Sequence, residues 1–347
     1  MNNRSRISAG QLMLIFLLAR IMHTMLYRLD GFQTGTPLML GQLLATAAEA
    51  VMALPAVIWF SKHGKSPASA LGAGASRAIS VLYALYFTVI AGVTVALFAE
   101  FLQTKFSDTV MPGVAAAILC ASAAYCAWGG IEGLGRAATV VFWLFVGMFV
   151  LMAAVSEGSF EPLNLLPLSE GDGGRTAEYL TESLSSAWWI PMLCALGHHL
   201  KSGAAKAAYG YLIMKFAIVE TLLLLITLVL WRYVGVLGYP ILALGAYAKS
   251  DFIQRFDAIN MLVWAINCVL VLGVYVMIGS GAFKKPKPGA VFAAAAAAAF
   301  GWWQYKRGVK FDEPWYICFK LCGIILLGII LPLAALALSG RKKENAL

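Results

Sequence analysis

The sequence predicts an all-α membrane protein with ten transmembrane helices, and three observations carry that prediction. Hydrophobic residues make up 61% of the 347 residues and charged residues only 12%, whereas a soluble domain carries about 25% charged residues. The apolar residues form runs of about 20, the length that crosses a hydrocarbon core of ~30 Å. No long polar block interrupts these runs, so a sizeable soluble domain is excluded.

Ten apolar runs follow one another along the chain. Arg20 and His23 interrupt the first, but its apolar length favours a span. It is too long for a signal-peptide core and no small-residue cleavage site follows it, so we expect it to be uncleaved. The ninth run is mostly alanine, which is nearly neutral in membrane insertion. The expected spans lie near residues 8–27, 37–60, 79–101, 110–127, 137–155, 182–200, 209–231, 256–280, 288–303 and 315–338.

Basic residues predict the orientation of these spans. If the amino terminus is cytoplasmic and the spans alternate, most lysines and arginines fall in the inner connections, as the positive-inside rule requires. The outer connections then hold most of the acids, above all the one at 156–182. Both termini are therefore expected to be cytoplasmic. The net charge of +9 is explained by anionic lipid headgroups, and no nucleic acid partner is needed.

The longest connection divides the spans into two sets of five. An odd number gives the two halves opposite topologies, which is the arrangement of many transporters. We therefore expect one membrane domain with a first repeat over about 8–155 and a second over about 182–338. An extracytoplasmic loop at 156–181 joins them, and a cytoplasmic tail at 339–347 follows. The halves share no evident sequence identity, so this symmetry rests on the number of spans.

Polar residues interrupt the first span at helical spacing. Ionisable residues within a span are costly and usually face a bundle interior or a water-filled cavity. Arg20, His23 and Tyr27 fall on one helix face, with Thr24 beside them. This stripe predicts a site for a ligand or an ion. The alternative is a buried structural pair between Arg20 and Glu49, which lies at a comparable depth in the second span.

Two further glutamates lie within spans. Glu220 is about 16 Å along the seventh span from its inner end, at 1.5 Å per helical residue, and is therefore expected to need a partner or a water pathway. Lys215 lies nearer the interface and is expected to extend to the headgroups. Glu100, near the outer end of the third span, is either an interfacial acid or a functional one.

The sixth and eighth spans carry a proline and a polar stripe, respectively. Pro191, in the run from Trp188, is expected to kink or break the sixth span, because proline removes a backbone hydrogen bond. Broken helices commonly frame transporter sites, although plain kinks are common too. The polar stripe of the eighth span consists of Asp257, Asn260, Trp264 and Asn267. These side chains either form hydrogen bonds to neighbouring helices or line a cavity, and we favour the cavity.

Signatures of catalysis and of cofactor binding are missing from the sequence. It contains no nucleophile elbow, phosphate-binding glycine loop or metal-ligand cluster, so we expect neither an enzyme nor a cofactor. His198-His199 lacks a third ligand with metal-site spacing and is expected to be interfacial. The cysteines match no zinc spacing and are expected to pack as small hydrophobic residues at positions Cys120, Cys126, Cys194, Cys268, Cys318 and Cys322.

Three local patterns occur in one order between Ile7 and about residue 338. They are Phe98-Ala99-Glu100-Phe101 followed by Met111-Pro112; Gly130-Ile131-Glu132 followed by Arg136; and Leu237-Gly238-Tyr239-Pro240 followed by Phe252, Arg255-Phe256-Asp257, Trp264 and Tyr275. Together they resemble the B subunit of GerA-type spore germination receptors. That family is a branch of the amino acid–polyamine–organocation transporter superfamily.

This resemblance implies a LeuT-like fold of two inverted five-helix repeats, with the first and sixth spans unwound around a central site. It implies that a small germinant, usually an amino acid, is sensed there. The implied partners are an A subunit with soluble domains and a C subunit that is a lipoprotein, in a bacterial cell membrane or the inner spore membrane. Glu100 matches an acid of the family pattern, which favours a functional role for it.

The first span departs from the family pattern. Small residues or glycines usually stand where that helix unwinds, whereas the segment from Arg20 to Met25 contains no glycine. Charge and bulk at this point indicate either a different, anionic ligand or an occupied site that no longer binds one.

Three functions are compatible with these features. The first is a germination receptor subunit that senses a small nutrient and signals to its partners. The second is a proton- or sodium-coupled amino-acid transporter, and the third is a non-binding or water-conducting scaffold. The expected ligand-binding residues are Arg20, His23, Thr24, Trp188, Pro191, Asn260 and Trp264, and the expected coupling or water-pathway residues are Glu49, Glu100, Glu220 and Asn267.

Overall fold

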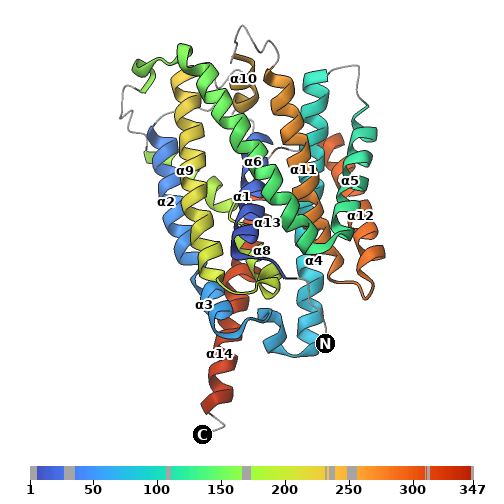
Figure 1. Cartoon of the computed structure of the whole chain (residues 1–347). Helices are drawn as coiled ribbons and strands as arrows, with labels where there is room; N and C mark the ends of the chain where they lie inside the picture. Colours follow the sequence, from blue (N-terminus) through green and yellow to red (C-terminus); the bar gives the residue numbers. More distant parts are fainter. Residues whose placement is uncertain are drawn as a thin grey trace.

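The computed structural model describes residues 6–26, 36–106, 111–165, 173–230, 233, 239–247, 256–308, 310 and 313–344. These residues form a bundle of helices (Figure 1). The one strand-like pairing among the described residues is an isolated bridge between Ile7 and Leu200. The all-α prediction is therefore confirmed.

The first half of the chain forms six α-helices. The second predicted span consists of two of them, with Pro55 in the first turn of the second helix, where proline is tolerated. A short 3-10 turn, η1 (Pro67–Leu71), precedes the long fourth helix. The helices are α1 (Ala9–Leu26), α2 (Thr36–Met52), α3 (Leu54–His63), α4 (Ala73–Phe106), α5 (Pro112–Trp128) and α6 (Gly130–Ser156).

The second half contains shorter pieces as well as long helices. Its last span is continuous, because α13 and α14 are joined by η6 (Ile324–Ile330), a π-helical segment. The short turns η2 (Glu157–Ser159), η3 (Pro162–Leu165) and η4 (Gly197–His199) lie between helices. The helices are α7 (Gly173–Ser185), α8 (Trp189–Leu196), α9 (Ala204–Leu230), α10 (Pro240–Tyr247), α11 (Phe256–Ser280), α12 (Pro286–Arg307), α13 (Pro314–Gly323) and α14 (Leu331–Glu344).

Helix occupies each of the ten predicted ranges, and seven segments of the described chain are long and apolar enough to cross a membrane. The other three ranges depart from a simple span. The fourth, α5, has 17 residues; the sixth is broken between α7 and α8; and α12 has 22 residues but is rich in alanine. The chain is a multi-pass membrane protein, and the number of ten crossings and the inverted repeat stay predictions.

Two helices extend beyond the predicted spans. α7 begins at Gly173, inside the loop predicted for 156–181, because the charged residues of this segment fit an amphipathic helix. The tail predicted for 339–347 starts as the last turns of α14, whose end projects beyond the bundle (Figure 1). Tyr27, Phe252 and Arg255 lie outside the described residues, as does the side chain of Asp257.

α1 lies in the interior of the bundle and positions the site described below (Figure 1). It packs against α6, α9 and α11, and its consecutive residues 14–19 are all buried. A helix that is apolar all round is one that is buried on every side. Its amino-terminal end is fixed by the bridge at Ile7, whose N–H donates to the His199 carbonyl at 3.0 Å.

Candidate ligand-binding site

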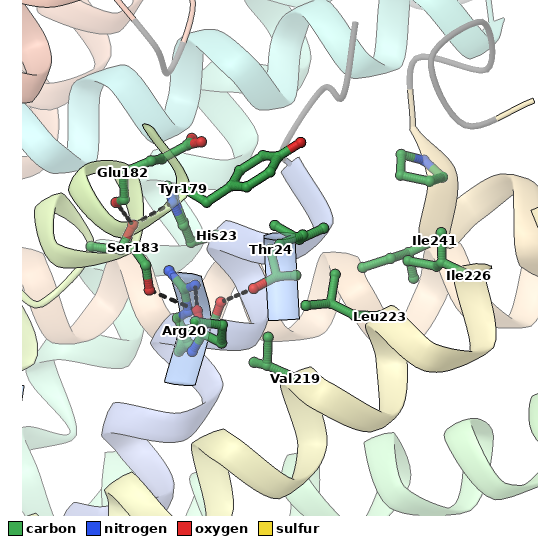
Figure 2. A pocket seen from close by; sticks show the side chains of 14 residues that line it. Arg20, His23, Thr24, Tyr179, Glu182, Ser183, Val219, Leu223, Ile226 and Ile241 are labelled. Atoms are coloured by element: carbon green, nitrogen blue, oxygen red, sulfur yellow. Dashed lines mark hydrogen bonds between the residues drawn. The ribbon is translucent and has the colours of Figure 1, made fainter. Parts of the chain in front are cut away.

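A cavity lies among α1, α2, α7, α9 and α10 (Figure 2). The cavity has a volume of about 80 Å³, of which one water molecule needs roughly 10–15 Å³. The cavity therefore has room for several waters or for a small organic molecule. Its lining residues are Arg20, His23, Thr24, Leu38, Gln42, Tyr179, Glu182, Ser183, Ser186, Val219, Leu223, Ile226, Pro240 and Ile241.

The lining divides into a polar wall and an apolar wall. α1, α2 and α7 supply the polar groups, whereas α9 supplies Val219, Leu223 and Ile226 at the three- and four-residue spacing of one helix face. Figure 2 shows Arg20 and Ser183 on one side, with the α9 side chains and Ile241 on the other. Such a cavity suits a molecule with one polar end and one apolar end.

Arg20 and Gln42 form the base of the polar wall. An Arg20 Nη2–H donates to Gln42 Oε1 at 3.4 Å, and the Ser183 hydroxyl donates to the same oxygen at 2.7 Å. These contacts turn the Gln42 oxygen towards Arg20 and its amide nitrogen away. Two buried nitrogens, Arg20 Nε and Gln42 Nε2, are left without a hydrogen-bond partner. An unsatisfied buried donor costs about 1–3 kcal/mol, and neither nitrogen has accessible surface on the cavity.

His23 connects α1 to the interruption of the sixth span. Its Nε2 lies 2.8 Å from Ser186 Oγ, and Ser186 Oγ is also 3.2 Å from the Glu182 carbonyl. The His23 ring meets the Trp188 ring edge to face, with centroids 4.7 Å apart. His23 and Ser186 are both buried. The polar wall of the cavity is thus tied directly to the helix break.

The sixth span is interrupted, as predicted, but the interruption precedes the proline. α7 ends at Ser185 and α8 begins at Trp189, so Pro191 lies within the first turn of α8, where its missing N–H breaks no bond. Trp188 and Pro191 do not line the cavity. The Pro191 ring instead lies close to Gly328 of η6, since a Cβ there would be 3.2 Å from its Cδ.

The unwinding of the first span that the family resemblance implies is absent here. α1 is helical from Ala9 to Leu26 without a break. The segment from Arg20 to Met25 has no glycine to favour a break, and the Thr24 hydroxyl donates to the Arg20 carbonyl at 3.0 Å within the helix. α1 therefore contributes the side chains of Arg20, His23 and Thr24 to the cavity from one unbroken helix.

Glu49 has a different partner from the predicted one. Its Oε1 accepts from Lys215 Nζ at 2.7 Å, with both side chains at most 2% exposed, and its Oε2 accepts from Trp189 Nε1 at 2.8 Å. The predicted Arg20–Glu49 pair was wrong, and so was the extension of Lys215 to the headgroups. Lys215 lies on the face of α9 that packs against α2, and a buried charge requires a partner.

The eighth-span stripe divides between its two alternatives. Asn260 and Trp264 line a separate small pocket with Met25, Phe101, Ile241 and Met261, and Trp264 Nε1 is buried without a hydrogen-bond partner. Asn267 instead donates to the Leu18 carbonyl at 3.1 Å, which is an interhelical bond. Ile241 borders both the small pocket and the main cavity.

The glutamates expected in coupling lie away from the main cavity. Glu100 is partly buried on α4, and Glu220 is partly buried on α9 with its Oε1 shielded and without a hydrogen-bond partner. Neither lines the cavity. Their roles in a proton or water pathway stay predictions.

The sequence reasoning missed several residues of the interior. Gln42 is one: it precedes Glu49 by seven residues and so shares its helix face, a signal that the spacing contains. Ser183 and Ser186 were missed although they lie within the predicted sixth span, where their three-residue spacing places them on one helix face. Lys320, in the last span, is fully buried, with its ammonium 4.7 Å from the centroid of the Tyr316 ring. Its place within an apolar run was the available signal.

The described residues include no group of three or more His, Cys, Asp or Glu side chains placed to hold a metal. All six cysteines are free thiols, and three of them are buried. The polar groups that line the cavity are the Arg20 guanidinium, the Glu182 carboxylate, the Gln42 amide, the His23 imidazole and hydroxyl groups.

A bundle of apolar helices around an internal cavity with one polar wall, bounded by a broken helix, defines a polytopic membrane protein. Residues 68–298, more than half of the chain, match a family described as spore germination protein, of the spore permease type. The chain belongs to this family. No protein with curated functional information matches it. The matched range includes Ser183, Ser186 and Lys215, whereas Arg20, Gln42 and Glu49 precede it.

Proposed function

We propose that this chain is the membrane-embedded subunit of a spore germination receptor and that its cavity binds a small nutrient germinant carrying a carboxylate, such as an amino acid. The observation that carries the proposal is Arg20, which lines the cavity within a membrane-spanning helix and, in the described chain, forms no ion pair with a carboxylate. A carboxylate supplies the counter-charge, and its hydrogen bonds to a guanidinium are charge-assisted and therefore strong. Membership of the spore germination protein family supports the biological setting.

In this proposal the helix break converts binding into a signal. Ser183 and Ser186 join the polar wall to the end of α7, and α8 follows the break and packs against η6. η6 continues into α14, which reaches the end of the bundle (Figure 1). A ligand that binds more tightly to one arrangement of the break shifts the population towards it. The recipients are an A-type subunit and a lipoprotein C-type subunit.

A binding experiment tests the site. The purified chain in lipid nanodiscs is titrated with a panel of amino acids by calorimetry, beside Arg20→Met and the control Arg77→Met, which alters an exposed arginine outside the cavity. We expect binding that Arg20→Met weakens about ten- to a hundredfold and that Arg77→Met leaves unchanged. Equal affinity in wild type and Arg20→Met would contradict the proposed site.

A germination experiment tests the role. Spores that lack this chain are expected to lose their response to at least one nutrient, and the tagged chain is expected to co-purify with A-type and C-type subunits. Normal germination on every nutrient tested would count against a receptor.

A coupled transporter is the second candidate, and the shielded carboxylate oxygen of Glu220 favours it, because such a group suits proton movement within a bundle. Uptake of the same ligand into liposomes under an imposed proton or sodium gradient separates the two functions. Binding without uptake would support the receptor. A scaffold without a ligand site would bind none of the ligands, in the wild type or in Arg20→Met.

A further inference from the structure

We infer that the carboxyl-terminal end of α12 binds the phosphate headgroup of an anionic phospholipid from the surrounding bilayer. The binding groups are Lys306 and Arg307, each of which lies against a tryptophan ring. These residues do not line the cavity, so the inference goes beyond the proposed function and does not depend on it.

The two cations lie on the faces of aromatic rings. The Lys306 ammonium is 4.8 Å from the centroid of the Trp302 ring, and the Arg307 guanidinium carbon is 4.8 Å from the centroid of the Trp303 ring. Both cationic side chains are exposed. A ring face attracts a cation without neutralising its charge, so each side chain is restrained and still available to an anion.

The described acids nearest in sequence to this site are already used or lie deeper. Glu313 accepts from the Lys310 backbone N–H at 3.1 Å and also from the Trp315 indole. Glu100 is partly buried on α4, more than a turn before that helix ends. Within the described chain, neither of the two cations on α12 has a carboxylate within ion-pair distance. An anion from outside the chain can therefore pair with them.

The end of α4 lies beside the end of α12. The two helices pack against each other, and the Tyr305 hydroxyl donates to Gln103 Oε1 on α4. Lys105, which is exposed, follows Gln103 by two residues. Lys310, also exposed, comes shortly after α12 ends. These two lysines add positive charge around the pair on α12.

The length of α12 places the site at headgroup level. Its 22 residues span about 33 Å at 1.5 Å per residue, which matches a hydrocarbon core of ~30 Å. With the predicted crossing, its two ends reach the headgroups of opposite leaflets. Trp302 and Trp303 are exposed, and tryptophan is enriched at this interface.

Two further points favour a lipid over a free anion. The predicted orientation puts this end of α12 outside, where lysine and arginine act against the positive-inside rule, so their presence indicates a role other than topology. The exposed indole rings also offer apolar surface beside the cations. A phospholipid satisfies both features, because its phosphate meets the cations while its acyl chains contact the rings.

Native mass spectrometry of the chain in a neutral detergent tests the inference. The probes are phosphatidylglycerol, which is anionic, and phosphatidylcholine with the same acyl chains, which has no net charge. We expect phosphatidylglycerol to bind at least tenfold more tightly, and excess inorganic phosphate not to displace it. The double variant Lys306→Gln with Arg307→Gln is expected to weaken its binding about twentyfold, since each basic residue contributes roughly fivefold.

A matched control removes the same charge from the other end of α12. Lys284→Gln with Lys285→Gln alters two exposed lysines there and is expected to leave the tightest phosphatidylglycerol site in place. An equal loss in this control would overturn the inference, because net charge alone would then govern binding. Equal affinity for the two lipids, measured on the unaltered protein, would overturn it too, and so would displacement by inorganic phosphate. Unchanged lipid binding in Lys306→Gln with Arg307→Gln, together with loss of a co-purifying membrane protein, would overturn it in favour of a protein partner at this end.

Discussion

Two polar regions of the interior, the Glu49 cluster and the polar wall of the cavity, share α2 and differ in how completely their hydrogen-bonding groups are satisfied. In the Glu49 cluster, the carboxylate binds the Lys215 ammonium and the Trp189 indole, one on each oxygen. In the cavity, Arg20 has one long contact to Gln42, and two donors have no acceptor. Both regions join α2 to neighbouring helices, so membership of α2 alone does not explain their difference.

This difference assigns different roles to similar residues. A fully satisfied buried ion pair fixes how α2, α8 and α9 pack and has nothing left to offer a ligand. A partly satisfied arginine beside a cavity keeps its binding capacity at the expense of stability, which is typical of functional sites. Charge within a span therefore does not identify a site by itself, whereas unmet hydrogen-bonding capacity beside an open space does.

The largest expected effect follows from breaking the satisfied pair. Glu49→Gln removes the counter-charge of a fully buried lysine, and we expect a loss of about 3–5 kcal/mol in the free energy of unfolding. Thermal unfolding of the purified protein in detergent measures it, with Glu157→Gln as the control at an exposed glutamate. A transition temperature equal to that of the control would show that the pair does not hold the helices together.

Removing both charges sharpens the same comparison. In the double variant Glu49→Leu with Lys215→Met no unpaired charge remains, so its unfolding temperature is expected to recover most of the loss seen for Glu49→Gln. Ligand binding should survive, because neither residue lines the cavity. A double variant that folds well but no longer binds the ligand would show that the ion pair also has a role in binding. The Glu49 cluster and the cavity would then not differ in function.

Arg20→Met is expected to show the opposite pattern. The guanidinium makes one long hydrogen bond, of 3.4 Å to Gln42, so we expect the free energy of unfolding to change by no more than about 1 kcal/mol. Binding of a carboxylate ligand should fall about ten- to a hundredfold. Unfolding and ligand binding are measured on the same preparation of Arg20→Met. A large loss of stability would show that Arg20, like Glu49, is a structural residue.

Hydropathy and proline placement predicted much of the fold, because membrane crossing and helix interruption depend on local sequence. The helical ranges follow from such signals, and Pro191 marked the interrupted span, although the break precedes the proline and Pro191 lies in the first turn of α8. The first span stays helical for a local reason too, since no glycine occurs between Arg20 and Met25. Here the residues themselves were a better guide than the family resemblance.

The pairing of buried polar side chains with one another could not be predicted in the same way. Whether Glu49 meets Arg20 or Lys215 depends on the rotation and relative depth of three helices, and a single sequence gives depth only to within about a turn. Gln42 is a different case, since its seven-residue spacing from Glu49 is visible in the sequence and places both residues on one face of α2. Gln42 lines the cavity from that face. Polar residues of every kind on a span face, uncharged ones included, carry this information.

The smallest predicted effect concerns how Gln42 is held. Ser183→Ala removes the 2.7 Å hydrogen bond to Gln42 Oε1, so the amide is less firmly oriented. We expect carboxylate affinity to fall only about three- to tenfold, with the free energy of unfolding lowered by roughly 0.5–1.5 kcal/mol. Ser159→Ala, at an exposed serine, is the control. Affinity that falls as far as in Arg20→Met would mean that the Ser183 hydroxyl itself contacts the ligand, and that the polar wall extends onto α7.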